Sequence, residues 1–582
     1  MQSLKQDLQE IIFEAVKRSG FNEIKEDEIP LEAPPSFVGG DFASNVALVL
    51  GEKAKENPQE IAKKIAQFLN ESKAAKRVIE KAEVAGGGFI NVTLTSAYLV
   101  QQLARAMKGG EKFGKGDALK GKKIMVEFTD PNPFKEFHIG HLYSNAVGES
   151  IARLLESQGA EVKRASYQGD VGLHVAKALW GMEQKLKTVP LKALEKKTLN
   201  EKVKFLGEAY ALGAKMFEED SALKEEINEL NKKIYELHPS IKKLYGRGRK
   251  WSLDYFETIY KRLGTKFDFS YFERDTGKEG LAYVKKFLAK HVFEKSKGAV
   301  IFNGEKYGLH TRVFINSQGL PTYEAKELAL AFMKYQDFPC DESIIVTGSE
   351  INEYFKVVLT ALEEINPQLR AKTKHISHGM VRLPEGKMSS RKGEVITGEW
   401  LVNEAKSRVL EIMNASKSET DAGQKEAIAE TVAVGAVKYS LLKSSLGKDI
   451  TFDFNESINL EGASGPYLQY TYVRTKSVLK KAKHITFSTI VEKSISLNRQ
   501  ERQVIKLLLQ FSDVVRSAGF THSPNVLCTF LFEAAKAYNN FYGKHRIIGS
   551  GNEALRLALT FTVSHALKNG LALLGIQVPE KM

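Results

Sequence analysis

The sequence is poor in cysteine. Its 582 residues include only Cys340 and Cys528, which are far apart and have no neighbours in zinc-ligand spacing. We therefore expect no disulfide framework and no protein-bound zinc, and a reducing, cytoplasmic compartment fits. No apolar run approaches the roughly 20 residues that span a bilayer. The opening segment 1–20 is amphipathic and lacks a signal-peptide core, so we expect no membrane partner.

The chain also has no fixed-period repeat and no low-complexity tract. It is too long for one ordinary core, so several domains are expected. The net charge of +14 and the isoelectric point of about 9.2 favour an anionic partner, with nucleic acid as the first candidate. Excess lysine is common in globular proteins, so charge alone does not establish such a partner.

Changes in pattern divide the chain into three parts. Residues 1–112 mix helix and strand patterns, with Pro58 opening the helical "NPQEIAKKIAQFLNE" and a glycine turn entering a strand in "VAGGGFINVTLT". The Gly- and Lys-rich "MKGGEKFGKGDALKGKK" is a linker that sets the first boundary. Residues 113–430 have the pattern of an α/β domain. Residues 431–582 read as helix, apart from a strand-prone stretch near "HITFSTIVEKSISLN".

The middle part begins with a strand–loop–helix–strand pattern over residues 124–168. "KIMVEFTD" is β-prone, "LYSNAVGESIARLLESQGA" is helical and ends at Gly159, and "EVKRASYQGD" is the next strand. This order predicts a right-handed βαβ unit in a parallel sheet. Residues 183–262 predict a helical insertion. Strand patterns return in "KGAVIFNG", "LHTRVFIN", "ESIIVTGSE" and "HISHGMVRLPEG".

Two histidines follow the first strand of this unit, in "PNPFKEFHIGHLYSN". His138 and His141 are three apart at an incipient helix start, so they share one face. Ligands of parallel α/β sheets bind where strands end and helices begin, and a helix N-terminus attracts phosphate. Gly140 removes a side chain where a nucleotide needs close approach.

This histidine pair has two other interpretations. The rings could merely cap and pack, which is common for a lone histidine. They could also bind a metal, but no nearby Cys, Asp or Glu completes a ligand set. The pattern H-x-G-H after a βα turn favours nucleotidyl transfer, with ATP attacked at its α-phosphate.

A basic loop, "LPEGKMSSRKGEVIT", follows the last strand of the α/β part. Lys387, Arg391 and Lys392 supply positive charge, and Ser389 and Ser390 supply hydroxyls. Such a loop suits a departing pyrophosphate, where negative charge develops in the transition state. The alternative is a solvated basic turn, which the position after the last strand makes less favourable.

"HIGH" followed by "KMSS" resembles the signature of class I aminoacyl-tRNA synthetases. "VEFTDPNPFKEFHIGH" and "YQGDVGLH" are similar to the arginyl-tRNA synthetase form. "GDFASNVALVL" and "VAGGGFINVTL" resemble its N-terminal domain, which touches the tRNA D-loop, and "ASGPYLQYTYVRTKS", "NNFYGKHRIIG" and "NGLALLGIQVPEKM" resemble its helical anticodon-binding domain. The resemblance implies a Rossmann-like α/β core with a parallel sheet, between an N-terminal α+β domain and a C-terminal helical bundle.

The resemblance also implies a reaction and its residues. ATP-dependent ligation of L-arginine to tRNA(Arg) would pass through an arginyl-adenylate and release AMP and diphosphate, in protein synthesis. The implied catalytic residues are His138, His141 and Lys387, and the ATP-binding residues are His138, Gly140, His141, Lys387, Ser389 and Ser390. The implied cofactor is ATP with Mg²⁺, and a monomer is expected.

A guanidinium is planar and permanently charged, so carboxylates that accept paired N–H bonds suit it best. The arginine-binding residues that the resemblance implies are Glu127, Asp130, Asn132, His138, Tyr323 and Glu327. Tyr323 and Glu327 are four apart in a predicted helix and share a face. The family commonly has Asp where this chain has Glu327, and the extra methylene moves the carboxylate.

The C-terminal part mixes aromatic and basic side chains, which suits stacking on loop bases with cations on the backbone. The expected tRNA-binding residues are Asn91, Tyr470, Arg474 and Tyr542. The alternative for any one aromatic is a place in the helical core.

Three other functions are open to a sequence with these motifs. Another class I synthetase is disfavoured by the missing zinc cysteines and the short insertion. A small-molecule nucleotidyltransferase needs no helical RNA-reading part. A non-catalytic tRNA-binding relative would not require both motifs, yet both are intact.

Overall fold

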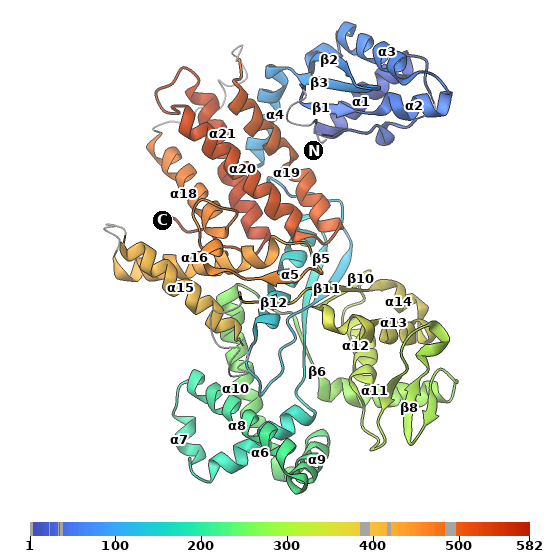
Figure 1. The fold of residues 1–582 in the computed structure, drawn as a ribbon, viewed down its shortest axis with the longest axis vertical. Helices are drawn as coiled ribbons and strands as arrows, with labels where there is room; N and C mark the ends of the chain where they lie inside the picture. The colour runs from blue at the N-terminus through green and yellow to red at the C-terminus, as the bar shows by residue number, and fades with distance from the viewer. Residues whose placement is uncertain are drawn as a thin grey trace.

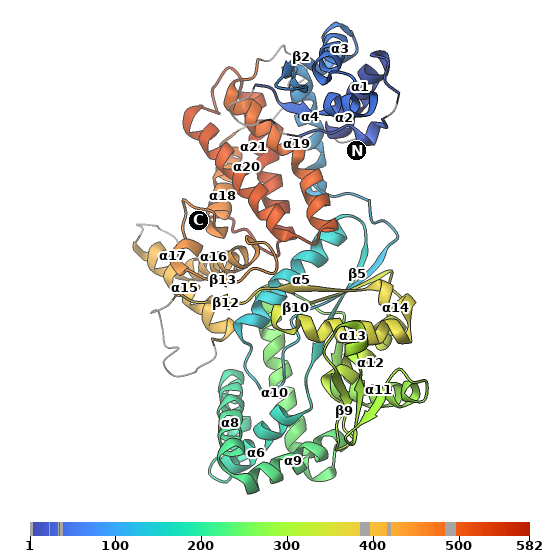
Figure 2. The same ribbon diagram turned by 45° about the vertical axis from the view of Figure 1, so that its right-hand side comes forward.

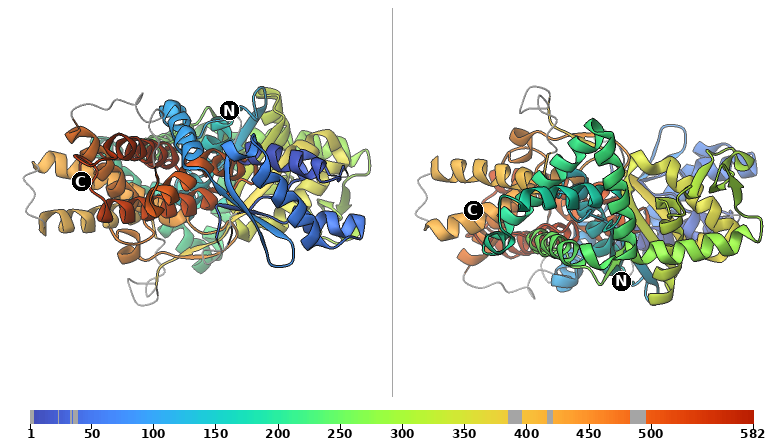
Figure 3. Two further views of the ribbon diagram at one scale, coloured as in Figure 1. Left: turned by 90° about the horizontal axis from the view of Figure 1, so that it is seen from above. Right: turned by 90° about the horizontal axis from the view of Figure 1, so that it is seen from below.

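The computed structural model describes residues 4–22, 24–32, 34, 39–384, 396–415, 421–482 and 496–582. The molecule is elongated (Figures 1 and 2). The N-terminal domain lies at one end, the C-terminal helices follow, and the central sheet lies beyond them. The helical insertion and the region of α11–α14 lie side by side at the far end, as the right-hand view in Figure 3, seen from below, also shows.

The N-terminal part is a small α+β domain. An antiparallel sheet of order β1-β3-β2 packs against helices, and Pro58 stands at the start of its helix with Asn57 as the cap, as the sequence predicts. The elements are α1 (Leu4–Arg18), β1 (Phe42–Ser44), α2 (Val46–Ala54), α3 (Pro58–Glu71), β2 (Ile79–Ala85), β3 (Phe89–Leu94) and α4 (Ser96–Gly109).

The central sheet has five strands in the order β11-β10-β4-β5-β6, and every neighbouring pair is parallel. Its strands are β4 (Lys123–Glu127), β5 (Glu161–Gln168), β6 (Phe269–Phe272), β10 (Glu342–Gly348) and β11 (Thr373–His378). α5 (Ile139–Ser157) joins β4 to β5, which confirms the predicted βαβ unit. Gly159 follows α5 with φ +92°, a conformation that glycine adopts without strain.

The helical insertion has a core of its own. Val175, Leu179, Leu206, Ile227 and Trp251 belong to one buried cluster, separate from the main core. The helices are α6 (Leu173–Leu186), α7 (Leu191–Glu195), α8 (Leu199–Glu219), α9 (Ser221–Glu236) and α10 (Pro239–Leu263). The expected limits 183–262 therefore fall inside α6 and inside α10.

A second, smaller sheet lies outside the central one. The strands predicted in "KGAVIFNG" and "LHTRVFIN" pair antiparallel with each other instead of joining the parallel sheet, and the first of them also pairs with a short third strand. The elements of this region are α11 (Glu273–Leu288), β7 (Glu294–Ser296), β8 (Ala299–Phe302), β9 (Arg312–Ile315), α12 (Tyr323–Asp337), α13 (Asn352–Ile365) and α14 (Pro367–Lys372).

The remainder is helical, apart from two short paired strands, β12 (Val381–Arg382) and β13 (Ile450–Thr451). The helices are α15 (Gly398–Ala415), α16 (Ala422–Leu442), α17 (Phe454–Ser457), α18 (Gly465–Lys481), α19 (Arg499–Phe520), α20 (Pro524–Lys544) and α21 (Glu553–Leu573). The expected boundary between 430 and 431 falls within α16. The strand-prone stretch near residues 484–498 lies mostly outside the described residues. None of the helices described is long and apolar enough to cross a membrane.

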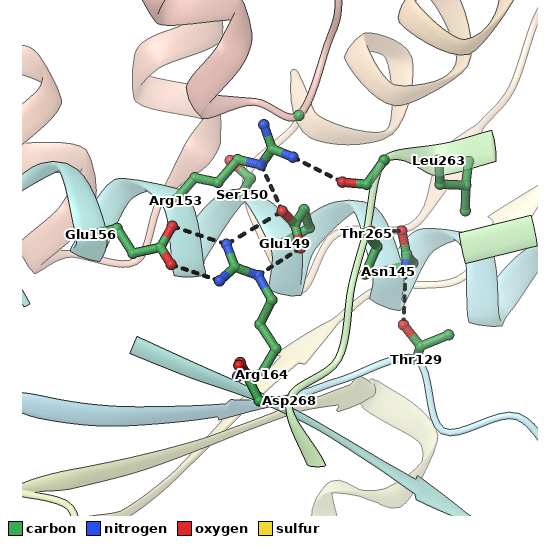
Figure 4. A network of polar contacts seen from close by, with 12 residues as sticks. Thr129, Asn145, Glu149, Ser150, Arg153, Glu156, Arg164, Leu263, Thr265 and Asp268 are labelled. Carbon is green, nitrogen blue, oxygen red and sulfur yellow. Dashed lines mark hydrogen bonds and ion pairs between the residues drawn. The ribbon is translucent and has the colours of Figure 1, made fainter. Parts of the chain in front are cut away.

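Charged contacts join the parts of the chain. Asp41, 3% exposed, accepts a hydrogen bond from Arg502 at 2.8 Å and pairs with Lys506 at 3.1 Å, which holds the N-terminal domain on α19. On α5, Glu149 bridges Arg153 and Arg164 (Figure 4). Arg153 also donates to the backbone carbonyl of Ala572, so α5 is tied to the end of α21.

Candidate active site

The candidate site lies where the strand order reverses. From β4 the chain runs outward through β5 and β6 on one side, and through β10 and β11 on the other. Ligands of open parallel sheets bind at such a switch point, beyond the carboxyl ends of the strands. Glu127 ends β4, and the "PNPFKEFHIGH" stretch follows after three further residues.

The loop between β4 and α5 is strained. Thr129, Asp130 and Phe134 have φ values of +83°, +45° and +68°, which residues other than glycine rarely adopt. Thr129 receives a hydrogen bond on its hydroxyl from Asn145 at 3.0 Å (Figure 4), and its N–H donates to Ser144 at 2.9 Å. Such strain persists where the surroundings over-determine it, which is common at functional sites.

The two histidines form a stacked pair at the start of α5. Their ring centroids are 3.5 Å apart, with 24° between the planes. His138 Nδ1 accepts the N–H of Gly140 at 3.1 Å, and His141 Nδ1 accepts the N–H of His138 at 3.2 Å. Because each Nδ1 is an acceptor, each neutral ring carries its proton on Nε2 and can donate there.

Burial keeps both histidines neutral. Burial, together with the charge of Lys135, lowers the pKa of His138, while Glu350 opposes the shift. Burial also lowers the pKa of His141, 7% exposed, well below the usual value, and the charges of His138 and Lys135 add to that effect. Neutral rings with Nε2–H groups at a helix N-terminus suit hydrogen bonding to phosphoryl oxygens. The described residues contain no group of three or more His, Cys, Asp or Glu that could hold a metal ion.

Two glycines of the predicted motifs leave room for neighbouring side chains. A Cβ on Gly140 would meet the His138 ring at 3.0 Å, so this glycine makes room first for the capping histidine. A Cβ on Gly169, in "YQGDVGLH", would lie 2.2 Å from Oδ1 of Asn132 and 3.1 Å from Oε1 of Glu273. The "YQGDVGLH" motif therefore borders Asn132 from the neighbouring strand.

Glu127, Asp130 and Glu327 form an acidic cluster around Lys334 on α12, in which both glutamates are buried and Asp130 is half-buried. Glu127 and Lys334 are each 1% exposed and form an ion pair. Burial and the charge of Glu127 raise the pKa of Glu327 to about 8, while Lys334 opposes the shift. Burial and Glu127 also raise the pKa of Asp130, whose carboxylate accepts the N–H of Tyr167 at 2.7 Å.

A second buried ion pair lies beside this cluster. Lys326 on α12 donates to Glu273 of α11 at 2.5 Å. Lys326 also lies 4.5 Å from the ring centroid of Tyr323 and donates to the hydroxyl of Tyr235 at 3.3 Å. Tyr323 is 57% exposed, whereas Glu327, four residues on, is 8% exposed. Tyr235 belongs to α9, so the helical insertion contributes to this edge of the site.

The predicted arginine-binding and histidine residues thus lie around one end of the sheet: Glu127, Asp130, Asn132, His138, His141, Tyr323 and Glu327. Lys387, Ser389 and Ser390 lie outside the described residues.

Sequence reasoning missed four charged residues here: Asp170, Glu273, Lys326 and Lys334. A signal existed for Lys334, because it stands seven residues after Glu327 and shares its helix face within the apolar "LALAFMK". Asp170 is fully buried and accepts from Arg249 at 2.9 Å.

The predicted C-terminal residues meet at one surface. The Arg474 guanidinium lies 4.8 Å from the ring centroid of Tyr470 and 5.1 Å from that of Tyr542, which is 39% exposed. We call these three residues the C-terminal patch. Tyr538 and Tyr472 are buried core residues, the alternative weighed from the sequence. Asn91, on β3, is only 7% exposed, so little of its side chain faces outward.

Comparison with known proteins gives a consistent result along the chain. Residues 102–454 match the model "tRNA synthetases class I (R), catalytic domain". Residues 3–94 match "Arginyl tRNA synthetase N terminal domain", and residues 468–582 match "DALR anticodon binding domain".

Individual relatives agree. The chain is 32% identical to an arginine–tRNA ligase of Bdellovibrio bacteriovorus, over 96% of this chain and 95% of that protein. It is 30% identical to one of Clostridium botulinum, over 95% and 96% of the two chains. The fold is similar to Thermus thermophilus arginyl-tRNA synthetase, with a TM-score of 0.79 at 24% identity and 100% of both chains covered. The chain belongs to the class I arginyl-tRNA synthetases.

Proposed function

We propose that this protein activates L-arginine with ATP and transfers it to tRNA(Arg), using the residues around the end of β4. One observation carries the proposal. Among the described residues, an acidic cluster around Lys334 lies at the end of β4, and a neutral histidine pair begins α5, the helix that follows. The first feature suits a guanidinium, and the second suits a phosphate.

In the first step, an arginine carboxylate oxygen attacks the α-phosphorus of ATP, and the bond to the β-phosphate oxygen breaks. His138 and His141 donate Nε2–H to the phosphoryl oxygens, where negative charge increases in the transition state. The N-terminus of α5 adds the positive end of its helix dipole. Mg²⁺ enters bound to the ATP phosphates. Lys387, with Ser389 and Ser390, stabilises the leaving diphosphate.

Arginine is oriented by groups at both of its ends. Glu127, Glu327 and Asp130 face the guanidinium, while the Asn132 amide oxygen accepts from the α-ammonium group. Tyr323, which is 57% exposed, covers the aliphatic part of the substrate. Glu327 is one methylene longer than the family's usual Asp, and its ion-paired neighbour Lys334 lies on the same helix. The acidic cluster therefore sets the preference for a cationic side chain.

In the second step, a terminal ribose hydroxyl of the tRNA attacks the arginyl carbonyl, and AMP leaves. Bases of the anticodon loop stack on the C-terminal patch, with Arg474 near their backbone. Residues 1–112 contact the D-loop, through their exposed surface more than through the buried side chain of Asn91. Residues 113–430 carry the chemistry, and residues 431–582 bind the anticodon. The protein acts as a cytoplasmic monomer.

The test is ATP–diphosphate exchange with each proteinogenic amino acid, with and without tRNA. Arginine alone should support exchange, and only when tRNA is present, as in the family that the motifs resemble. Exchange with another amino acid, or none with arginine under any condition, would contradict the proposal.

A further inference from the structure

Lys334 occupies an unusual place for a lysine. It stands near the end of α12 and is 1% exposed, although lysine is almost never fully buried without a partner. Its partner is Glu127, which is also 1% exposed and ends β4. Removing one member of such a pair leaves an uncompensated charge in the interior. Lys334 thereby fixes the position of the Glu127 carboxylate.

Charges around Glu327 do not balance. The groups that face it are Glu127 of β4, Asp130 of the following loop, Lys334 of its own helix, Glu273 of α11, Tyr167 of β5 and Tyr354 of α13. Glu273 has its own lysine, Lys326. Burial raises the pKa of both tyrosines, so they carry no charge. Within the part of the chain that the structure describes, three carboxyl groups therefore share one cation.

This imbalance has a consequence for protons. Burial together with the Glu127 charge raises the pKa of Glu327 to about 8, and it raises the pKa of Asp130 well above its usual value. At neutral pH, without substrate, the carboxyl groups of the cluster hold at least one proton. A second cation entering the cluster would lower these pKa values and release that proton.

We propose that Lys334 is the resident cation of the arginine pocket, a positioning residue that holds the Glu127 carboxylate in place. With this one cation the acidic cluster remains one positive charge short and holds a proton instead. The guanidinium of arginine replaces that proton when it binds. The inference rests on the proposed function, because it takes arginine as the ligand. It adds that the affinity for arginine depends on pH, and that Lys334 sets the pH at which this affinity levels off.

The sign of the linkage follows from the pKa direction. Free protein binds more protons than the arginine complex below about pH 8, so affinity rises with pH up to that value and then levels off. We expect about one proton released per arginine at pH 7, and affinity about tenfold higher at pH 7 than at pH 6.

The experiment is isothermal titration of the full chain with L-arginine, with unacylated tRNA present and ATP absent, in two buffers of different ionisation enthalpy. Glu327→Gln should bind more weakly and lose most of the proton release. Comparison with this variant cancels the titration of arginine itself. Proton release that is absent in the wild type, or unchanged in Glu327→Gln, overturns the proposal.

Lys334→Met tests the positioning role. Loss of the cation raises the pKa of the remaining carboxyls, so the pH at which affinity levels off should move up by about one unit or more. The matched control is Lys438→Met, another 1% exposed lysine, which donates to the Gly575 carbonyl of the C-terminal segment at 2.8 Å. In this control, the affinity for arginine should level off at the same pH as in the wild type.

If the arginine affinity of folded Lys334→Met levels off at the same pH as that of the wild type, the proposed positioning role of this lysine is wrong. If that variant does not fold, the wild type and Glu327→Gln still decide whether guanidinium replaces a proton. Failure of the proposed function gives a different result, since arginine would then not bind at all.

Discussion

The acidic cluster and the C-terminal patch use the same kinds of side chain in opposite surroundings. In the cluster, Glu127 and Lys334 are each 1% exposed, and the positions of their charges are fixed by β4 and α12. In the patch, Arg474 lies over two tyrosine rings, and Tyr542 is 39% exposed. A buried charge depends on its partner, whereas an exposed ring depends mainly on what stacks on it.

This difference predicts that substitutions in the two regions affect different properties of the protein. Substitutions in the cluster should affect stability and arginine activation together, because the same ion pair serves both. Substitutions in the patch should affect only tRNA use, and their effect should depend on salt, because phosphate contacts are screened.

The largest effect is expected for Glu127→Ala. It leaves Lys334 buried without a partner, which should lower the free energy of unfolding by about 3–5 kcal/mol and abolish arginine activation. Chemical denaturation and ATP–diphosphate exchange measure the two effects. Glu127→Gln keeps the shape and should be less destabilised. Equal stability of Glu127→Ala and the wild type would show that the pair does not matter to the fold.

A large kinetic effect without a change of fold is expected for His138→Ala. Loss of an Nε2–H donor to the transition state should slow adenylate formation by about 10²–10³-fold. Because burial lowers the pKa of His138, the wild-type rate should not fall as pH drops through 6.5 on account of this ring. Single-turnover kinetics at several pH values test both statements. A fall centred at 6.5 would mean that the ring is not held neutral.

Much of this site could be predicted from the sequence, because its parts are local. The βαβ unit, the helix of Tyr323 and Glu327, and the histidine pair each follow from spacing within a few residues. The Glu127–Lys334 pair joins positions 207 residues apart, and no local pattern specifies it. Similarly, the spacing of the tyrosines in α18 and α20 does not reveal that Tyr538 is core and Tyr542 surface. The small antiparallel sheet was missed because its strand patterns do not encode their partners.

A moderate effect is expected for Gly169→Ala. The new Cβ would lie 2.2 Å from Oδ1 of Asn132, so that amide must move. The KM for arginine should rise about tenfold, because an orienting hydrogen bond is worth roughly 1.5 kcal/mol. Gly246→Ala in α10 is the matched control, since nothing lies within 4 Å of its added Cβ. An unchanged KM in Gly169→Ala would remove Asn132 from the site.

The smallest effect is expected for Tyr542→Ala. Loss of one stacking ring, worth about 1–3 kcal/mol per base, should raise the KM for tRNA at least fivefold. Exchange at saturating tRNA should not change. Tyr538→Phe, four residues earlier in α20 and fully buried, should leave the KM for tRNA at its wild-type value. A loss of arginine activation in Tyr542→Ala at saturating tRNA would mean that the patch and the cluster are not separable.

The most direct test of the acidic cluster compares arginine with citrulline, in which a neutral ureido group replaces the guanidinium. The measurement is kcat/KM for tRNA-dependent ATP–diphosphate exchange with each. If carboxylates recognise the cation, citrulline should be disfavoured by about 10⁴-fold, because its carbonyl oxygen would face them without a donor. A preference below about tenfold would contradict recognition by Glu127 and Glu327, since it is no larger than a single neutral hydrogen bond accounts for.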